Sequence, residues 1–246
     1  MPLAIVSPHA FEPQPTFDLH APDGFFSVPV ALIMWVVAIL VIAISVRRAG
    51  RSFDERAIPL MGVTAAFIFA AQMINFPVVG GTSGHLLGAV LVAVLLGPWA
   101  GTLVMASVIA VQSLLFQDGG LLAMGANIVN MGLIGTIFGY AIYRAVARLL
   151  GGEERARLPA AAIAAWSSVM LGAAVTSLGL AVSGTTTLAV VLPAMLGTHA
   201  LIGIGEALIT VGALALIANA RPDLLRLRDG TPAASGSGPA LEMSES

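Results

Sequence analysis

Two histidines on separate segments are the residues of this sequence best suited to hold a ligand. His20 begins the segment His-Ala-Pro-Asp-Gly-Phe, and His85 follows a glycine-rich turn and precedes an apolar run. The sequence contains no cysteine, so thiolate metal sites, disulfides and cysteine nucleophiles are excluded. Imidazoles without thiolates suit divalent nickel, cobalt, copper or zinc. The alternative for His85 is a simple turn in which one histidine faces lipid headgroups.

Polar side chains surround His85 in the sequence. Gln72 and Asn75 end the apolar run before the glycine-rich turn, and Ser83 lies two residues before His85. Irregular backbone at the end of an apolar run is tolerated in lipid only where protein or a cavity covers it. We therefore expect Gln72, Asn75 and Ser83 to hydrogen-bond around the histidine site.

Further polar residues lie within later apolar runs. Asn127 and Asn130 are one helical turn apart on one face. They either hydrogen-bond a site histidine or link neighbouring helices. Glu206 follows His199 by two helical turns on one face, and a carboxylate inside a membrane needs a partner. We expect Glu206 to pair within the bundle or with a partner subunit, away from the outer loops.

A second pattern suggests a different class of protein. The segment Gly81-Thr-Ser-Gly84 matches the Gly-x-Ser-Gly pattern of rhomboid-type intramembrane serine proteases. Ser83 would be the nucleophile and His199, on another apolar run, its base, since a serine needs a base within hydrogen-bond reach. This hypothesis leaves His85 without a role.

The composition indicates a multi-pass protein of the cell's plasma membrane. Apolar residues make up 58% of the 246 residues and charged residues 10%, whereas soluble domains have about 25% charged residues. The basic residues are all arginine, so a phosphate-binding Gly-x-x-x-x-Gly-Lys loop is excluded. We expect a lipid bilayer around the chain, no nucleic-acid partner, no enzymatic activity and no resident cofactor.

The apolar runs predict an all-α domain of seven transmembrane helices over residues 19–220. An N-terminal extension would occupy residues 1–18 and a cytoplasmic tail residues 221–246. Arginines follow the first, fifth and seventh runs, so these ends should be cytoplasmic. The N-terminus would then lie outside and the C-terminus inside. The seven expected spans are 28–46, 58–76, 85–96, 99–116, 121–143, 159–182 and 188–218.

Several linked blocks resemble the CbiM/NikM family, the substrate-binding membrane components of energy-coupling-factor transporters for cobalt and nickel. The resemblance runs from His20 to about Ala220. It rests on His20-Ala-Pro-Asp-Gly-Phe-Phe26, Ala70-Ala-Gln-Met-Ile-Asn-Phe-Pro77, Gly80-Gly-Thr-Ser-Gly-His-Leu-Leu-Gly88, Gly119-Gly-Leu-Leu-Ala-Met-Gly-Ala-Asn-Ile-Val-Asn-Met-Gly132 and Gly203-Ile-Gly-Glu-Ala-Leu-Ile-Thr210.

The resemblance implies a ligand set and partners. Family members hold the metal with an N-terminal amine, the backbone nitrogen and imidazole of the next histidine, and a second histidine after the second helix. Here these histidines would be His20 and His85, and Leu19 would supply the amine if it begins the mature chain, for example from a misassigned start codon. Otherwise His9, Glu12 or Asp18 would replace it. The transported ion would be Co(II) or Ni(II), and the partners a coupling transmembrane subunit, ATPase subunits and a small accessory membrane subunit.

Overall fold

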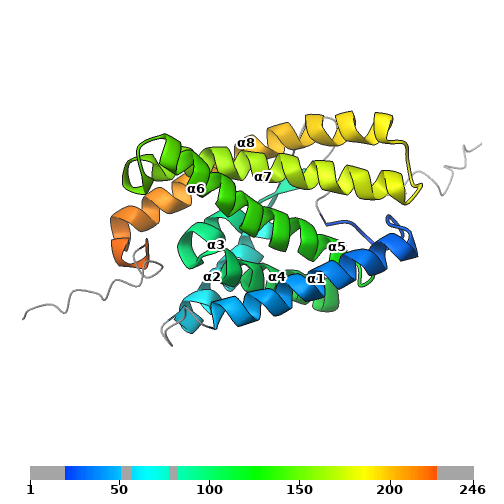
Figure 1. The fold of residues 1–246 in the computed structure, drawn as a ribbon, viewed down its shortest axis with the longest axis horizontal. Helices are drawn as coiled ribbons and strands as arrows, with labels where there is room; N and C mark the ends of the chain where they lie inside the picture. The colour runs from blue at the N-terminus through cyan, green and yellow to red at the C-terminus, as the bar shows by residue number, and fades with distance from the viewer. Residues whose placement is uncertain (1–19, 51–56, 78–82, 226–246) are drawn as a thin grey trace, which may run out of the picture.

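The computed structural model describes residues 20–50, 57–77 and 83–225 (Figure 1). The expected extension, with His9, Glu12, Asp18 and Leu19, and residues 226–246 of the expected tail lie outside this part. The described helices are α1 (Val28–Ala49), α2 (Ala57–Gln72), α3 (Ala89–Leu96), α4 (Pro98–Leu115), α5 (Met124–Asn127), the π-helix η2 (Ile128–Phe138), α6 (Gly139–Leu149), α7 (Glu153–Val182), α8 (Leu188–Ala220) and the short 3-10 helix η3 (Pro222–Leu225).

The helices form two groups with α3 between them. The helices α7 and α8 run side by side along one edge, and α6 packs against α7 (Figure 1). The helix α4 packs against both α1 and α2 on the other edge. The continuous helix formed by α5, η2 and α6 joins the two groups, because it contacts α1, α4 and α7.

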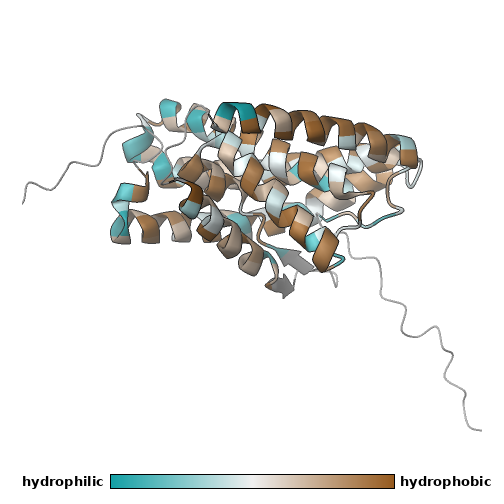
Figure 2. Ribbon diagram, turned by 90° about the horizontal axis from the view of Figure 1, so that it is seen from below, coloured by the Kyte–Doolittle hydropathy of each residue, from teal (hydrophilic) through white to brown (hydrophobic). Residues whose placement is uncertain are grey.

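Within the described residues, five helices are long and apolar enough to cross a membrane, namely α1, α4, the continuous helix Met124–Leu149, α7 and α8. Their middles are hydrophobic in Figure 2, and hydrophilic residues gather toward one end. The seven expected helical runs are all present, but two are shorter than expected. The helix α2 ends at Gln72 rather than at residue 76, and α3 begins at Ala89 rather than at His85.

The chain between α2 and α3 departs from the all-helical expectation. Strand β1 (Asn75–Pro77) pairs antiparallel with β2 (Ser83–His85), and Asn75 lies opposite His85. The α3 helix then covers only eight residues, or about 12 Å at 1.5 Å per residue. It cannot cross a hydrocarbon core of about 30 Å by itself. Its backbone is nevertheless protected, since residues 85–96 are all buried.

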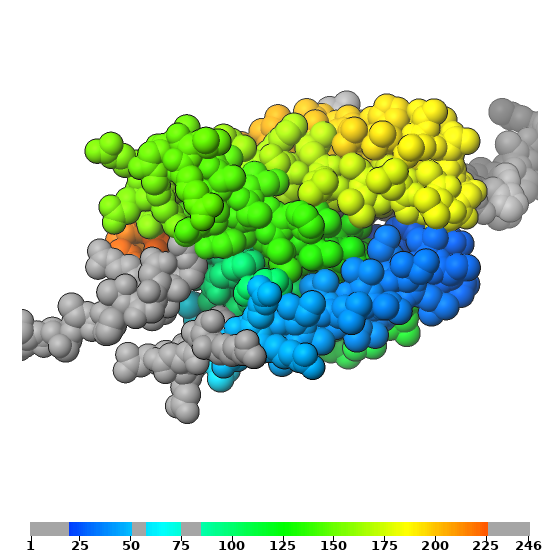
Figure 3. Space-filling model, viewed as in Figure 1, coloured from blue at the N-terminus to red at the C-terminus, as the bar shows by residue number. Residues whose placement is uncertain are grey.

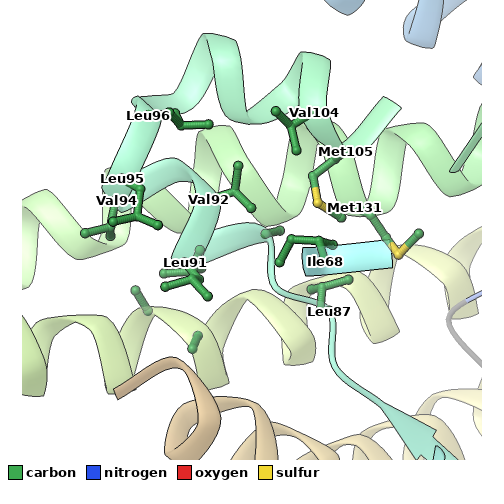
Figure 4. Packing of buried hydrophobic residues seen from close by; sticks show 14 of the residues in the cluster. Ile68, Leu87, Leu91, Val92, Val94, Leu95, Leu96, Val104, Met105 and Met131 are labelled. Carbon is green, nitrogen blue, oxygen red and sulfur yellow. The ribbon is translucent and has the colours of Figure 1, made fainter. Parts of the chain in front are cut away.

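Small residues let the neighbouring helices approach α3 closely. A Cβ at Gly135 would lie 2.5 Å from the Cβ of Ala89, and one at Gly139 would lie 2.8 Å from Val90 Cγ2. Apolar side chains of α2, α4 and η2 fill the rest of the space around α3 (Figure 4), including Ile68, Met105 and Met131. The short helix is therefore a central packing element rather than a surface segment.

The segment before α1 is held against the turn between α7 and α8. Thr185 Oγ1 donates a hydrogen bond of 2.5 Å to the carbonyl of Phe25. The ring of Phe26 is buried against Gly179, where a Cβ would lie 2.7 Å from Phe26 Cε1. Figure 3 shows this contact, with blue atoms of the N-terminal part beside yellow atoms of α7 and α8. This packing fixes where His20 enters the bundle.

Candidate metal site

The two histidines singled out from the sequence lie side by side in the structure. Their ring centroids are 4.7 Å apart and the rings are tilted by 31°. Each residue is only 7% exposed. His85 reaches this position at the end of β2, and His20 reaches it at the start of the described chain. Residues 65 positions apart in the sequence thus form one imidazole pair.

Both rings use Nδ1 in a hydrogen bond. His20 Nδ1 lies 3.1 Å from Oδ2 of Asp118, and His85 Nδ1 donates to the carbonyl of Leu86 at 2.9 Å. The Nε2 atoms of both rings are buried and have no hydrogen-bond partner among the described residues. When Nδ1 carries the proton, Nε2 presents a lone pair. The pair can therefore offer two nitrogen ligands to one divalent cation.

Asp118 is a member of this site that the sequence analysis missed. Its carboxylate is half-buried beside His20, and the hydrogen bond from that imidazole lowers the pKa of Asp118 below its ordinary value. A carboxylate on the second nitrogen of a ligand histidine orients the ring and makes it a better donor. The only sequence signal was its place in a polar loop after an apolar run.

Asn127 connects the segments that carry His20 and Asp118. Its Oδ1 accepts the backbone N–H of Ala21 at 2.9 Å, and its Nδ2 donates to the carbonyls of Ala21 and Gly119 at 3.1 and 3.0 Å. Gly119 has a φ of +90°, and a Cβ there would lie 2.8 Å from Asn127 Nδ2. Asn127 thus holds the backbone beside His20 and Asp118, and these hydrogen bonds go to backbone groups rather than to an imidazole.

The backbone after His85 is also held by buried side chains. Gln72 Nε2 donates to the carbonyl of Leu87 at 2.9 Å, and Gln72 Oε1 accepts from Gln112 Nε2 at 2.8 Å. From the other side, Glu206 Oε2 accepts the N–H of Leu87 at 2.7 Å and Oε1 accepts that of Gly88 at 2.8 Å. Gln72 therefore lies beside the site, as expected.

Glu206 pairs within the bundle, as expected, since its carboxylate accepts the N–H groups of Leu87 and Gly88. Residues 85–96 were expected to form one regular helix, whereas the chain remains non-helical to Gly88 and α3 covers only Ala89–Leu96. The sequence analysis did not anticipate that the partners of Glu206 lie two and three residues after His85.

The other expected residues have different outcomes. Asn130 Nδ2 donates to Thr176 Oγ1 of α7 at 2.8 Å, which is the helix-linking alternative. The side chains of Asn75 and Ser83 lie outside the described part of the chain. His199 donates from Nδ1 to the carbonyl of Met195 at 2.8 Å, one turn earlier in α8.

Among residues 20–50, 57–77 and 83–225, no group of three or more histidine, aspartate or glutamate side chains is arranged to hold a metal ion. The described site is thus a pair of imidazole nitrogens. It is supported by one carboxylate and by amide side chains.

The sequence matches a known family over most of its length. The family described as "Cobalt uptake substrate-specific transmembrane region", CbiM, matches residues 20–224. The fused nickel transport protein NikMN of Archaeoglobus fulgidus, a provisional name, is 41% identical over 209 residues, which cover 84% of this chain and 68% of that protein. The cobalt transport protein CbiM of Sorangium cellulosum is 30% identical over 84% of this chain and 94% of that protein.

A solved structure also resembles the fold. The crystal structure of a truncated transition metal transporter superposes with a TM-score of 0.74 at 32% sequence identity. The superposition covers 81% of this chain and 98% of the other.

Proposed function

Because this chain belongs to the CbiM family, whose members are multi-pass proteins of the plasma membrane, we propose that it captures Ni(II) or Co(II) for import. One observation carries the proposal: the Nε2 atoms of His20 and His85 are buried together without a hydrogen-bond partner among the described residues. Unpaired buried nitrogens are costly, and a cation that takes both lone pairs removes that cost.

The surrounding residues fit a site for a divalent cation. His20 is oriented by Asp118, whose negative charge partly offsets the charge of the ion. The test is titration of the purified full-length protein with Ni(II) and with Co(II), in which one ion should bind per chain. The relatives named above include both nickel and cobalt transport proteins, so both ions are compared.

The remaining donors of the proposed site come from the chain just before His20. Two imidazoles are fewer than the four nitrogens of a tetragonal site, the geometry that suits Ni(II). We propose that the free amine of residue 19, when that residue begins the chain, and the backbone nitrogen of His20 complete it. His9, Glu12 and Asp18 are the replacement donors if the preceding residues remain.

The proposed topology has seven passes, with the N-terminus outside. The non-helical residues 83–88 and the eight-residue α3 can together reach roughly 30 Å, at no more than about 3.3 Å per non-helical residue and 1.5 Å per helical residue. This supports one full crossing by the two segments in series. Arginines after the first, fifth and seventh passes support the orientation.

The orientation predicts the result of reporter fusions. A reporter fused after Asp229 should be cytoplasmic, because three arginines precede that point and basic residues stay inside. A reporter inserted at Thr185, between α7 and α8, should be external. Paired alkaline phosphatase and fluorescent-protein fusions measure both. A reversed result at either point would contradict the seven-pass arrangement.

Transport would require other subunits. The sequence has no lysine and hence no Gly-x-x-x-x-Gly-Lys loop for ATP. We propose that a coupling transmembrane subunit, ATPase subunits and a small accessory membrane subunit assemble with this chain. The family match gives no support to the rhomboid-like alternative with Ser83 and His199.

A further inference from the structure

Glu206 is a buried carboxylate in the middle of a long helix. It is 1% exposed and lies 18 residues after the first residue of α8, ~27 Å along the axis at 1.5 Å per residue. A carboxylate at such a depth is unfavourable unless it is fully hydrogen-bonded. Both of its oxygens accept backbone N–H groups, from Leu87 and Gly88, at 2.7 and 2.8 Å.

These two donors belong to the start of α3, which has no cap of its own. Gly88 is the residue before the first helical residue, its φ is 73°, and no side chain of the neighbouring sequence caps the helix. The first N–H groups of a helix lack partners within it, and negative charge there is favoured by the helix dipole. Glu206 therefore caps α3 from another helix.

The same carboxylate also holds the segment that carries His85. On its opposite side, the carbonyl of Leu87 accepts from Gln72 of α2, which Gln112 of α4 holds in turn. The carbonyl of Leu86 accepts from His85 itself. The backbone of Leu87 and Gly88 is thus held by side chains of two helices, α2 and α8, and the His85 ring hydrogen-bonds to the carbonyl of the adjacent Leu86.

We infer that Glu206 is a positioning residue of the metal site, because it sets where the His85 imidazole stands relative to that of His20. The inference rests on the proposed function of that imidazole pair. Glu206 itself does not touch the ion. Its carboxylate fixes the backbone that directly follows His85. A change at Glu206 should therefore alter the coordination geometry of the bound ion as well as the affinity of the site for that ion.

The test is Glu206→Gln in the full-length protein. A glutamine amide replaces one of the two carboxylate oxygens with an NH2 group. Its remaining oxygen can accept from one backbone N–H group, but the NH2 group then faces the other N–H group, and two donors cannot form a hydrogen bond. We expect the affinity for Ni(II) to fall 10- to 100-fold, the range known for residues that support metal ligands. The absorption bands of bound Ni(II) should also shift, because the nitrogen plane is distorted.

Thr210→Val is the matched control. Thr210 lies one turn after Glu206 in α8, is fully buried, and its hydroxyl has no hydrogen-bond partner among the described residues. This substitution changes a buried polar side chain of the same helix without touching Leu87 or Gly88. It should leave both the affinity and the Ni(II) spectrum unchanged. Glu206→Asp keeps the charge but is one methylene shorter, so it should reproduce the spectral shift if Glu206→Gln does not fold.

Several results would overturn the inference. Wild-type affinity and spectrum in Glu206→Gln and Glu206→Asp would show that the carboxylate does not position His85. A lower melting temperature with an unchanged spectrum would show that it serves helix packing alone, as would an equal effect in Thr210→Val. If His85→Ala loses binding while the Glu206 variants keep it, only this inference fails. If His85→Ala binds Ni(II) as the wild type does, the proposed function fails as well.

Discussion

Replacing His85 with alanine should abolish high-affinity binding of Ni(II) and Co(II). The substitution removes one of the two buried Nε2 atoms of the imidazole pair. Residues that merely support a metal ligand change affinity 10- to 100-fold, so loss of a ligand should exceed about 100-fold. Isothermal titration of the purified protein with each ion measures this. The fold can be checked by circular dichroism and by elution as a single species.

Ser83→Ala is the control for this experiment, because it alters the same loop and removes the residue that a serine protease would need. Metal binding should persist in Ser83→Ala, with at most a small loss. The opposite pattern, with binding retained in His85→Ala and a proteolytic activity lost in Ser83→Ala, would overturn the transport proposal.

A chain that begins at residue 19 should bind Ni(II) more tightly than the full-length chain, by on the order of 100-fold, the upper end of the range for changes around a ligand. A free amine one residue before His20 can form fused chelate rings with the backbone nitrogen and the imidazole. An α-amino group with a pKa of about 7.7–8.0 loses its proton readily when a metal binds. Titration and the Ni(II) absorption spectrum of the two proteins measure the difference.

The control is the same chain beginning at residue 19 with its α-amino group acetylated, which removes the amine donor and leaves both imidazoles in place. It should bind like the full-length protein. Equal affinity in all three proteins would exclude the amine as a ligand. It would direct attention to His9, Glu12 and Asp18, which could then be replaced one at a time.

The sequence was sufficient to identify the imidazole pair and most of the helices. His20 and His85 stand out because ionisable residues are rare in an apolar chain, and long apolar runs fix the helices within a few residues. Gln72 and Asn127 were expected near the site, yet their partners turned out to be backbone groups. Such partners have no signature in the sequence, because every residue carries an N–H and a carbonyl group.

Two features required the three-dimensional structure. Asp118 was one polar residue in a loop, and only the folding of that loop onto His20 reveals its role. The backbone partners of Glu206 were not predicted, because an apolar run is equally compatible with a helix and with a non-helical buried segment. The non-helical residues 86–88 bring the loop to the middle of α8, and composition alone does not distinguish this path from a regular span.

The burial of α3 affects how a mutational scan of this protein should be interpreted. All eight of its residues are buried, and glycines of the facing helix leave no room for added methyl groups. Most helices have an exposed face on which substitutions change stability little, whereas α3 has no such face. In a close-packed interior, adding or removing even one methylene group changes stability. A scan should therefore find that residues 89–96 tolerate substitutions as poorly as His20 and His85 do. Measuring protein abundance beside metal uptake would separate the two causes, since α3 variants lower the amount of protein while ligand variants lower uptake per molecule.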